Sequence, residues 1–203
     1  SARALAAELL GVDPANVSVM GSSSLNIMYD CVEHGYVHGI GGERPWCQQG
    51  EVKFLCPAPG YDRHFTVTES FGIQNVPVPM REDGPDMDVV REYVEKDATV
   101  KGIWCVPKYA NPTGVTYSDD VVRAFAALRP AAPDFRIFWD NAYCVHHLYA
   151  GRRDHLLDLY EACREAGTED RPLLFTSTSK ITFAGGGVSA MAASPRNIER
   201  QAA

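Results

Sequence analysis

A lysine preceded by two serines follows a short apolar run in the last part of the chain. Leu173-Leu174-Phe175 predicts a buried strand, and Ser177, Ser179 and Lys180 come where that strand gives way to a loop. In a poorly hydrated pocket a lysine gives up its charge more readily, and the free amine can then attack an aldehyde. The hydroxyl groups beside it could hold a phosphate.

Two other predicted strands end in residues that suit the same chemistry. The mostly apolar run Arg136–Asp140 ends in an acid, with Tyr143 three residues later, and the run 102–107 leads into the turn sequence 111–114. One compound, pyridoxal 5′-phosphate (PLP), carries both an aldehyde and a phosphate, and enzymes that use it keep its ring nitrogen protonated with a carboxylate. Asp140 could supply that carboxylate, although most aspartates at strand ends are turn formers. Tyr143 and the amide of Asn111 could reach the 3-hydroxyl of the ring.

The order of these motifs resembles the class I/II group of fold-type I PLP-dependent aminotransferases. The three motifs are Asn111-Pro112-Thr113-Gly114, Asp140-x-Ala142-Tyr143 and Ser177-x-Ser179-Lys180. Three further matches lie upstream. Gly21-Ser22-Ser23-Ser24 resembles the turn that wraps the PLP phosphate at a helix N-terminus, where the helix dipole favours an anion. Pro59-Gly60-Tyr61 resembles the place of the aromatic ring that stacks on the pyridine, and His64 resembles the histidine behind the aspartate.

The residues of these motifs also resemble those of one branch of the family, the bacterial aspartate aminotransferase subgroup. This subgroup is related to the aminotransferase domains of MocR-type regulators. This resemblance covers about residues 17–193. It implies transfer of an amino group from aspartate to 2-oxoglutarate through a PLP Schiff base on Lys180, in a cytoplasmic homodimer. The implied catalytic residues are Lys180, Asp140 and Tyr143. The implied cofactor-binding residues are Ser22, Ser23, Ser24, Tyr61, His64, Asn111, Asp140, Tyr143, Ser177, Ser179, Lys180 and Ser189.

One part of the lysine motif departs from the family pattern. Many class I enzymes carry an arginine shortly after the lysine that pairs with the phosphate, whereas the run 185–190 has none and the next arginine is Arg196. Glycine amides and Ser189 could take over this contact, because exposed backbone amides bind anions.

Other readings of the same residues remain open. A PLP-dependent lyase or decarboxylase would use the same lysine, aspartate and tyrosine, and a non-catalytic effector-binding domain of a regulator could keep the fold. A nucleotide-binding domain that uses Gly185-Gly186-Gly187 is disfavoured, because these glycines do not follow the first strand. The adjacent His146 and His147 point to different faces, which argues against a metal site. His34 and His38 could share a helix face but lack a third ligand nearby.

The elements that must position these residues alternate along the chain. Apolar runs predict strands near 17–20, 52–56, 73–79, 102–107, 136–140, 173–177 and 187–193, and helical patterns fall near 22–37, 61–70, 86–97, 118–129 and 154–166. Such alternation predicts a three-layer α/β/α fold with a mostly parallel, seven-stranded sheet. Ligands of such sheets bind at the carboxyl ends of the strands, where the residues singled out above fall.

Length and composition agree with the large domain of such an enzyme. The chain has 203 residues, of which 45% are hydrophobic and 22% charged. We expect residues 1–203 to form the PLP-binding large domain, with the N-terminal arm and the C-terminal small domain of the family absent. The net charge of −7, with scattered basic residues, argues against nucleic acid as a partner. No apolar run has membrane-spanning length, and six cysteines without a C-x-x-C pair indicate a reducing cytosol.

Overall fold

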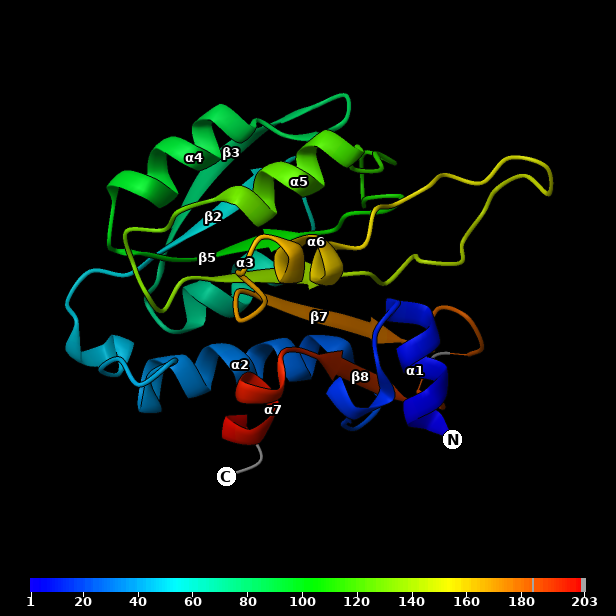
Figure 1. The fold of residues 1–203 in the computed structure, drawn as a ribbon, viewed down its shortest axis with the longest axis horizontal. Helices are drawn as coiled ribbons and strands as arrows, with labels where there is room; N and C mark the ends of the chain where they lie inside the picture. Colours follow the sequence, from blue (N-terminus) through cyan, green and yellow to red (C-terminus); the bar gives the residue numbers. More distant parts are fainter. Residues whose placement is uncertain (184, 202–203) are drawn as a thin grey trace.

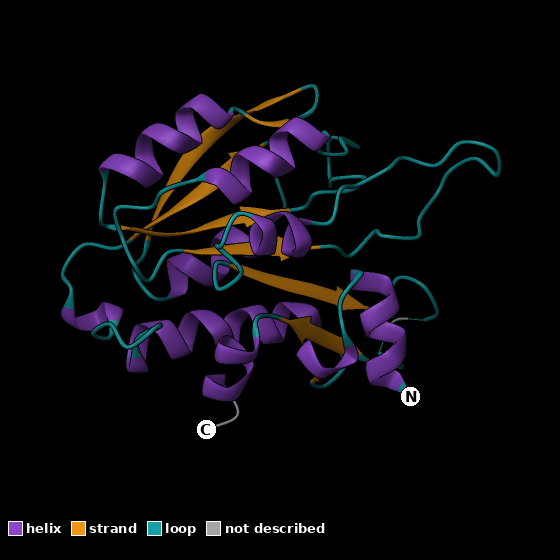
Figure 2. Ribbon diagram, in the orientation of Figure 1, coloured by secondary structure: helices purple, strands orange, loops and turns teal. Residues whose placement is uncertain are grey.

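A mixed eight-stranded sheet forms the centre of the protein in the computed structural model, which describes residues 1–183 and 185–201 (Figures 1 and 2). The strands are β1 (Val17–Val19), β2 (Lys53–Ala58), β3 (Gln74–Arg81), β4 (Gly84–Pro85), β5 (Val100–Cys105), β6 (Arg136–Asp140), β7 (Pro172–Ser177) and β8 (Ser189–Ala192). Their order across the sheet is β1-β8-β7-β6-β5-β2-β3-β4. The five inner strands from β7 to β3 are parallel, and β8, β1 and β4 each run antiparallel to their neighbours.

Helices cover both faces of the sheet. They are α1 (Ala2–Leu10), α2 (Ser24–His38), α3 (Asp62–Ser70), α4 (Met87–Lys96), α5 (Asp119–Ala127), α6 (Leu159–Glu165) and α7 (Pro195–Gln201), with short 3-10 turns η1 (Pro14–Asn16) and η2 (Trp46–Gln48). One buried cluster joins α1, α4, α5 and α6 to the sheet, and the other joins α2 and α3 to its opposite face. The predicted three-layer α/β/α architecture is therefore confirmed.

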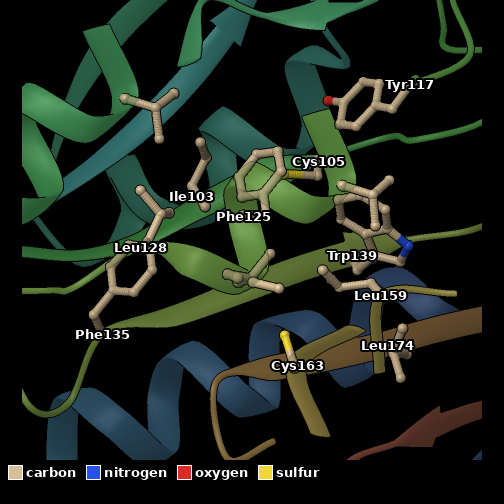
Figure 3. Close-up of a cluster of buried hydrophobic side chains, with 14 of the residues drawn as sticks. Ile103, Cys105, Tyr117, Phe125, Leu128, Phe135, Trp139, Leu159, Cys163 and Leu174 are labelled. Carbon is tan, nitrogen blue, oxygen red and sulfur yellow. The ribbon is translucent and has the colours of Figure 1, made fainter. Parts of the chain in front are cut away.

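Successive side chains of each inner strand belong alternately to one cluster and to the other. In β6, Ile137 and Trp139 pack with the α4–α5–α6 side, whereas Phe138 packs with the α2–α3 side. This alternation has the period of two expected for a strand buried on both faces. Figure 3 shows the first cluster, in which Phe125 of α5 lies edge-to-face with Trp139, at 5.6 Å between ring centroids.

The sheet has one strand more than predicted, and one helix is shorter. The extra strand, β4, is a two-residue pairing with the end of β3, too short to leave a pattern in the sequence. Helix α6 begins at Leu159 and not near 154, because the side chain of Asp158 accepts a hydrogen bond from the Glu161 amide and so caps the helix there. Helices α1 and α7 were not predicted.

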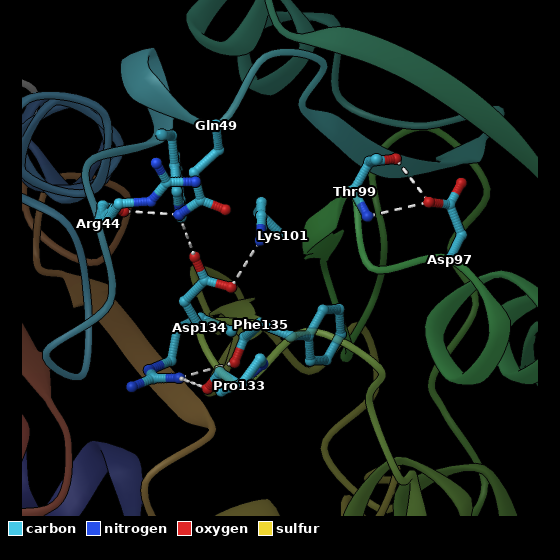
Figure 4. Close-up of polar contacts among 10 residues, drawn as sticks. Arg44, Gln49, Asp97, Thr99, Lys101, Pro133, Asp134 and Phe135 are labelled. Carbon is cyan, nitrogen blue, oxygen red and sulfur yellow. Dashed lines mark hydrogen bonds and ion pairs between the residues drawn. The ribbon is translucent and has the colours of Figure 1, made fainter.

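A buried polar network lies at the amino ends of β5 and β6 (Figure 4). Nζ of Lys101 lies 2.8 Å from Oδ1 of Asp134, and both side chains are at most 5% exposed. The other carboxylate oxygen of Asp134 accepts hydrogen bonds from the indole of Trp46, at 3.0 Å, and from the amide of Gln49, at 3.1 Å. The network fastens the loop around η2 to the amino ends of these strands, whereas the predicted site residues lie at the carboxyl ends.

Candidate active site

The predicted catalytic residues meet at the carboxyl ends of neighbouring parallel strands. Asp140 is the last residue of β6 and lies beside Phe175 of β7. Tyr143 and Lys180 follow on the loops after these two strands, and Nζ of Lys180 donates a hydrogen bond to the Tyr143 hydroxyl at 2.8 Å. Strand order thus brings Lys180 close to Tyr143 and Asp140, which lie 37 and 40 positions earlier in the sequence.

Asp140 is a buried carboxylate, and only one of its two oxygens has a hydrogen-bond partner among the described residues. It is 5% exposed, and its Oδ2 lies 2.9 Å from Nε2 of His64, which is 1% exposed. Its Oδ1 is buried and has no hydrogen-bond partner among residues 1–183 and 185–201. A buried carboxylate oxygen without a partner is costly, so this position calls for a hydrogen-bond donor from a ligand. The protonated ring nitrogen of PLP is a donor of this kind.

A cavity of about 330 Å³ opens in front of Asp140. It is lined by Ser22, Ser23, Ser24, Leu25, Met28, Tyr61, Asp140, Ala142, Ser177, Ser179, Lys180 and Gly185. Nζ of Lys180 lies 5.6 Å from the centroid of the Tyr61 ring, so the amine and the aromatic ring face the same space. The cavity therefore combines an amine, a carboxylate, an aromatic wall and a group of hydroxyls.

The serines gather at one end of this cavity through two turns that contact each other. Gly21 has a φ of 59°, and this left-handed turn leads into α2, whose capping residue Ser23 makes no capping hydrogen bond with its side chain. Oγ of Ser179 donates to the main-chain oxygen of Ser22 at 3.0 Å, and Oγ of Ser177 donates to Oγ of Ser179 at 2.9 Å. Because the first amides of a helix lack intrahelical partners, this end suits an anion.

Four predicted site residues are not among those that line the cavity: His64, Asn111, Tyr143 and Ser189. His64 is buried and contacts Asp140 through Nε2, at 2.9 Å. Asn111 is exposed and lines a smaller adjoining cavity of about 20 Å³ together with Tyr61 and His64. Ser189 is 1% exposed, and its hydroxyl donates to the main-chain oxygen of Met20 at 2.6 Å, so it fastens β8 to the serine turn and does not face the cavity.

Lys180 differs from its prediction in its surroundings. The sequence predicts a poorly hydrated pocket, whereas the side chain is exposed on the open loop after β7. That loop is held by Thr178, whose amide donates to the Val188 oxygen at 2.9 Å. A Cβ on Gly187 would lie 2.6 Å from Oγ1 of Thr178, so only glycine fits there. Arg196 pairs with Asp170 at 2.8 Å and does not replace the missing phosphate arginine.

Trp104 is a site residue that the sequence reasoning missed. In the sequence it is only one residue of the apolar run 102–107, whereas in the structure its ring stacks on His64 with centroids 4.7 Å apart. The signal was available: Trp104 alternates with Ile103 and Cys105 and so faces α3, the helix that carries His64.

The histidines and the helices of the described part of the chain were also candidates for metal ligands and for a membrane span. His34 and His38 do share a helix face, with ring centroids 5.3 Å apart, but no group of three or more ligating side chains occurs among these residues. No helix that the structure describes is both long and apolar enough to cross a membrane.

Comparisons with known proteins agree on one family. The model of the aspartate aminotransferase family matches residues 1–202. A Mycolicibacterium smegmatis protein with a provisional aminotransferase name is 55% identical over 97% of this chain and 46% of its own length. The crystal structure of an aspartate transaminase from Corynebacterium glutamicum superposes with a TM-score of 0.93 at 47% identity, over 98% of this chain and 46% of that one. The chain thus spans about half the length of these relatives.

A more distant likeness concerns the fold alone. Histidinol-phosphate aminotransferase from Sinorhizobium meliloti, solved in complex with PLP, gives a TM-score of 0.73 at 20% identity, over 98% of this chain and 48% of that one.

Proposed function

Since the chain belongs to the aspartate aminotransferase family, we propose that it is the PLP-binding large domain of an aminotransferase. The observation that carries the proposal is the pairing of the buried Asp140, whose Oδ1 lacks a partner within the described residues, with Lys180 and the serines around one cavity. The residues fit the cofactor, because the cavity offers a carboxylate for its ring nitrogen, an amine for its aldehyde and hydroxyls for its phosphate.

Each side chain then has a defined task. Asp140 would hold a proton on the ring nitrogen, and His64 would fix the carboxylate through the contact at 2.9 Å. Ser22, Ser23, Ser24, Ser177 and Ser179 would bind the phosphate, and Tyr61 would cover one face of the ring. When bound, PLP supplies a ring that accepts the negative charge developing on the substrate.

Lys180 would act first as the nucleophile and then as the base that moves the substrate proton. Its hydrogen bond to Tyr143 keeps the amine at the mouth of the cavity. An amine that moves a proton must lie within hydrogen-bond reach of it, so the position of Nζ decides whether Lys180 can act.

We propose aspartate as the amino donor and 2-oxoglutarate as the acceptor, in a homodimer. Support for aspartate comes from the family and from the similarity to the Corynebacterium glutamicum aspartate transaminase. We also propose a cytoplasmic location, supported by six free cysteines, five of them buried.

The first test is an absorption spectrum of the full-length protein with PLP, beside a Lys180→Ala variant and a Lys96→Ala control from the exposed face of α4. We expect a visible band in the wild type and the control that is absent from Lys180→Ala, and borohydride trapping should mark the peptide with Lys180. Adding aspartate should then bleach the band, and 2-oxoglutarate should restore it. Trapping elsewhere in a folded wild type would overturn the cofactor assignment, whereas trapping without bleaching would favour a lyase or an effector-binding domain.

A further inference from the structure

Two adjacent histidines follow Tyr143 and point in opposite directions. They belong to the β6–α6 arm, residues 141–158, which extends beyond the carboxyl ends of the strands (Figure 1). Both are half-buried, although the neighbouring Leu148 and Tyr149 are 84% and 66% exposed. The tasks described above leave both histidines unused.

His146 contacts both partners of the hydrogen bond between Lys180 and Tyr143. Its Nε2 lies 2.9 Å from the main-chain oxygen of Lys180. Since a carbonyl only accepts, Nε2 carries the proton and donates. The imidazole also meets the Tyr143 ring edge-to-face, with centroids 5.4 Å apart and planes at 83°. One side chain thus fixes the backbone of the lysine and the ring of its partner.

His147 fastens the arm to the loop after β5. Its Nδ1 lies 2.8 Å from the hydroxyl of Tyr109. This hydroxyl accepts from the Asp154 amide at 3.0 Å, which leaves its own proton for His147. Desolvation, followed by the charges of Lys108 and Arg153, lowers the pKa of His147 and so favours the neutral, accepting ring.

Exposure of Lys180 makes this support necessary. The lysine lies on an open loop, and a flexible side chain loses effectiveness when its backbone is free to move, because a displacement of about 1 Å can cost a factor on the order of 10² in rate. A donor on the main-chain oxygen restrains the backbone and leaves the amine free.

We propose that His146 is a positioning residue for Lys180, and that His147 anchors the arm from which His146 acts. The inference rests on the proposed function, since it concerns the approach of Lys180 to PLP.

The test is the rate at which Lys180 captures PLP in the full-length protein, followed by borohydride trapping and peptide mapping at fixed pH. Three variants are compared with the wild type: His146→Leu, which removes the donor, His146→Gln, whose amide can reach the position of Nε2, and Leu148→Ala, a control at a residue of the arm that is 84% exposed. We expect His146→Leu to be slower by between about threefold and tenfold, the range for one neutral hydrogen bond. His146→Gln should recover most of this loss.

Unfolding by urea, measured on the same samples without PLP, separates positioning from simple loss of fold. We expect the midpoints of His146→Leu and His146→Gln to be similar, so that only the capture rate distinguishes them. Equal rates for His146→Leu and the wild type, or no recovery in His146→Gln, would overturn the role of His146. His147→Leu should be slower in the same direction, and a wild-type rate there would overturn the anchoring role.

The same measurements distinguish failure of this inference from failure of the proposed function. If the folded wild type captures no PLP on Lys180, the proposed function is wrong. If the wild type captures PLP and the variants match it, only the inference about the arm is wrong.

Discussion

The imidazole of His64 lies almost parallel to the indole of Trp104, with planes inclined by 13° and centroids 4.7 Å apart. The stacked ring can turn only in its own plane, and Nε2 then faces Oδ2 of Asp140. The carboxylate that would hold the cofactor ring is therefore supported through two layers of side chains that come from three separate elements, α3, β5 and β6.

Removing the imidazole should destabilise the PLP-free protein. In His64→Leu the carboxylate of Asp140 loses its donor, and breaking a buried pair in this way costs about 3–5 kcal/mol. His64→Gln keeps a donor and should cost about half as much. Urea unfolding monitored by circular dichroism measures both free energies. Equal losses in the two variants would mean that packing, and not the hydrogen bond, is the contribution of His64.

Asp140→Asn should separate cofactor capture from turnover. The amine of Lys180 is unaffected, so borohydride should still trap PLP on Lys180. Turnover should fall by a factor on the order of 10², because an amide no longer stabilises a protonated ring nitrogen electrostatically. Single-turnover rates with aspartate, beside trapping yields, provide the measurement. Wild-type turnover in this variant would remove Asp140 from the catalytic residues.

The Lys101–Asp134 pair should matter for stability and not for chemistry. Lys101→Met leaves a buried carboxylate with only its two neutral donors, and we expect a loss of about 3–5 kcal/mol in the free energy of unfolding. The double variant Lys101→Met with Asp134→Leu should lose less than Lys101→Met alone, since no uncompensated charge remains. Urea unfolding tests this order, and a double variant less stable than the single one would contradict it.

The surroundings of Asp97 predict that the stability of the fold decreases at acidic pH. Hydrogen bonds from the Thr99 hydroxyl, then from Lys53, lower the pKa of Asp97 from 3.8 to about 2 (Figure 4 shows the Thr99 contacts). A carboxyl with a lowered pKa stabilises the fold above its ordinary pKa, and this contribution disappears as the pH falls from about 4 to about 2.

Because the Asp97 side chain is 27% exposed, we expect the lost stability to be roughly 1–2 kcal/mol. The comparison is between unfolding free energies of the wild type and Asp97→Asn at pH 5 and at pH 2.5. Their difference should shrink toward the lower pH, and a difference that stays constant would show that ionisation of Asp97 contributes nothing to stability.

The sequence was most informative where apolar runs were continuous. All seven predicted strands are present. Burial on both faces leaves a run of apolar residues that is hard to mistake. By contrast, β4 has two residues and no such run, and the start of α6 depends on a hydrogen bond of Asp158 that a helical pattern cannot show.

For the candidate site, too, the sequence pattern predicted the position of the residues in the fold but not their individual side-chain contacts. Motif order predicted which residues would gather at the strand ends, because parallel strands bring their carboxyl ends to one edge. It could not predict that the Ser189 hydroxyl donates to the main-chain oxygen of Met20 or that Lys180 lies exposed. Each of these depends on side-chain geometry between distant segments.

The opposed directions of His146 and His147 also limit how the arm can evolve. Substitutions at the exposed Leu148 and Tyr149 change the surface and leave both histidine contacts intact. An insertion or deletion of one residue between Tyr143 and His146 would shift both histidines along the chain relative to Lys180 and Tyr109 and break both contacts at once. Relatives that keep this pair of histidines should therefore vary in the composition of this loop while its length before His147 stays fixed.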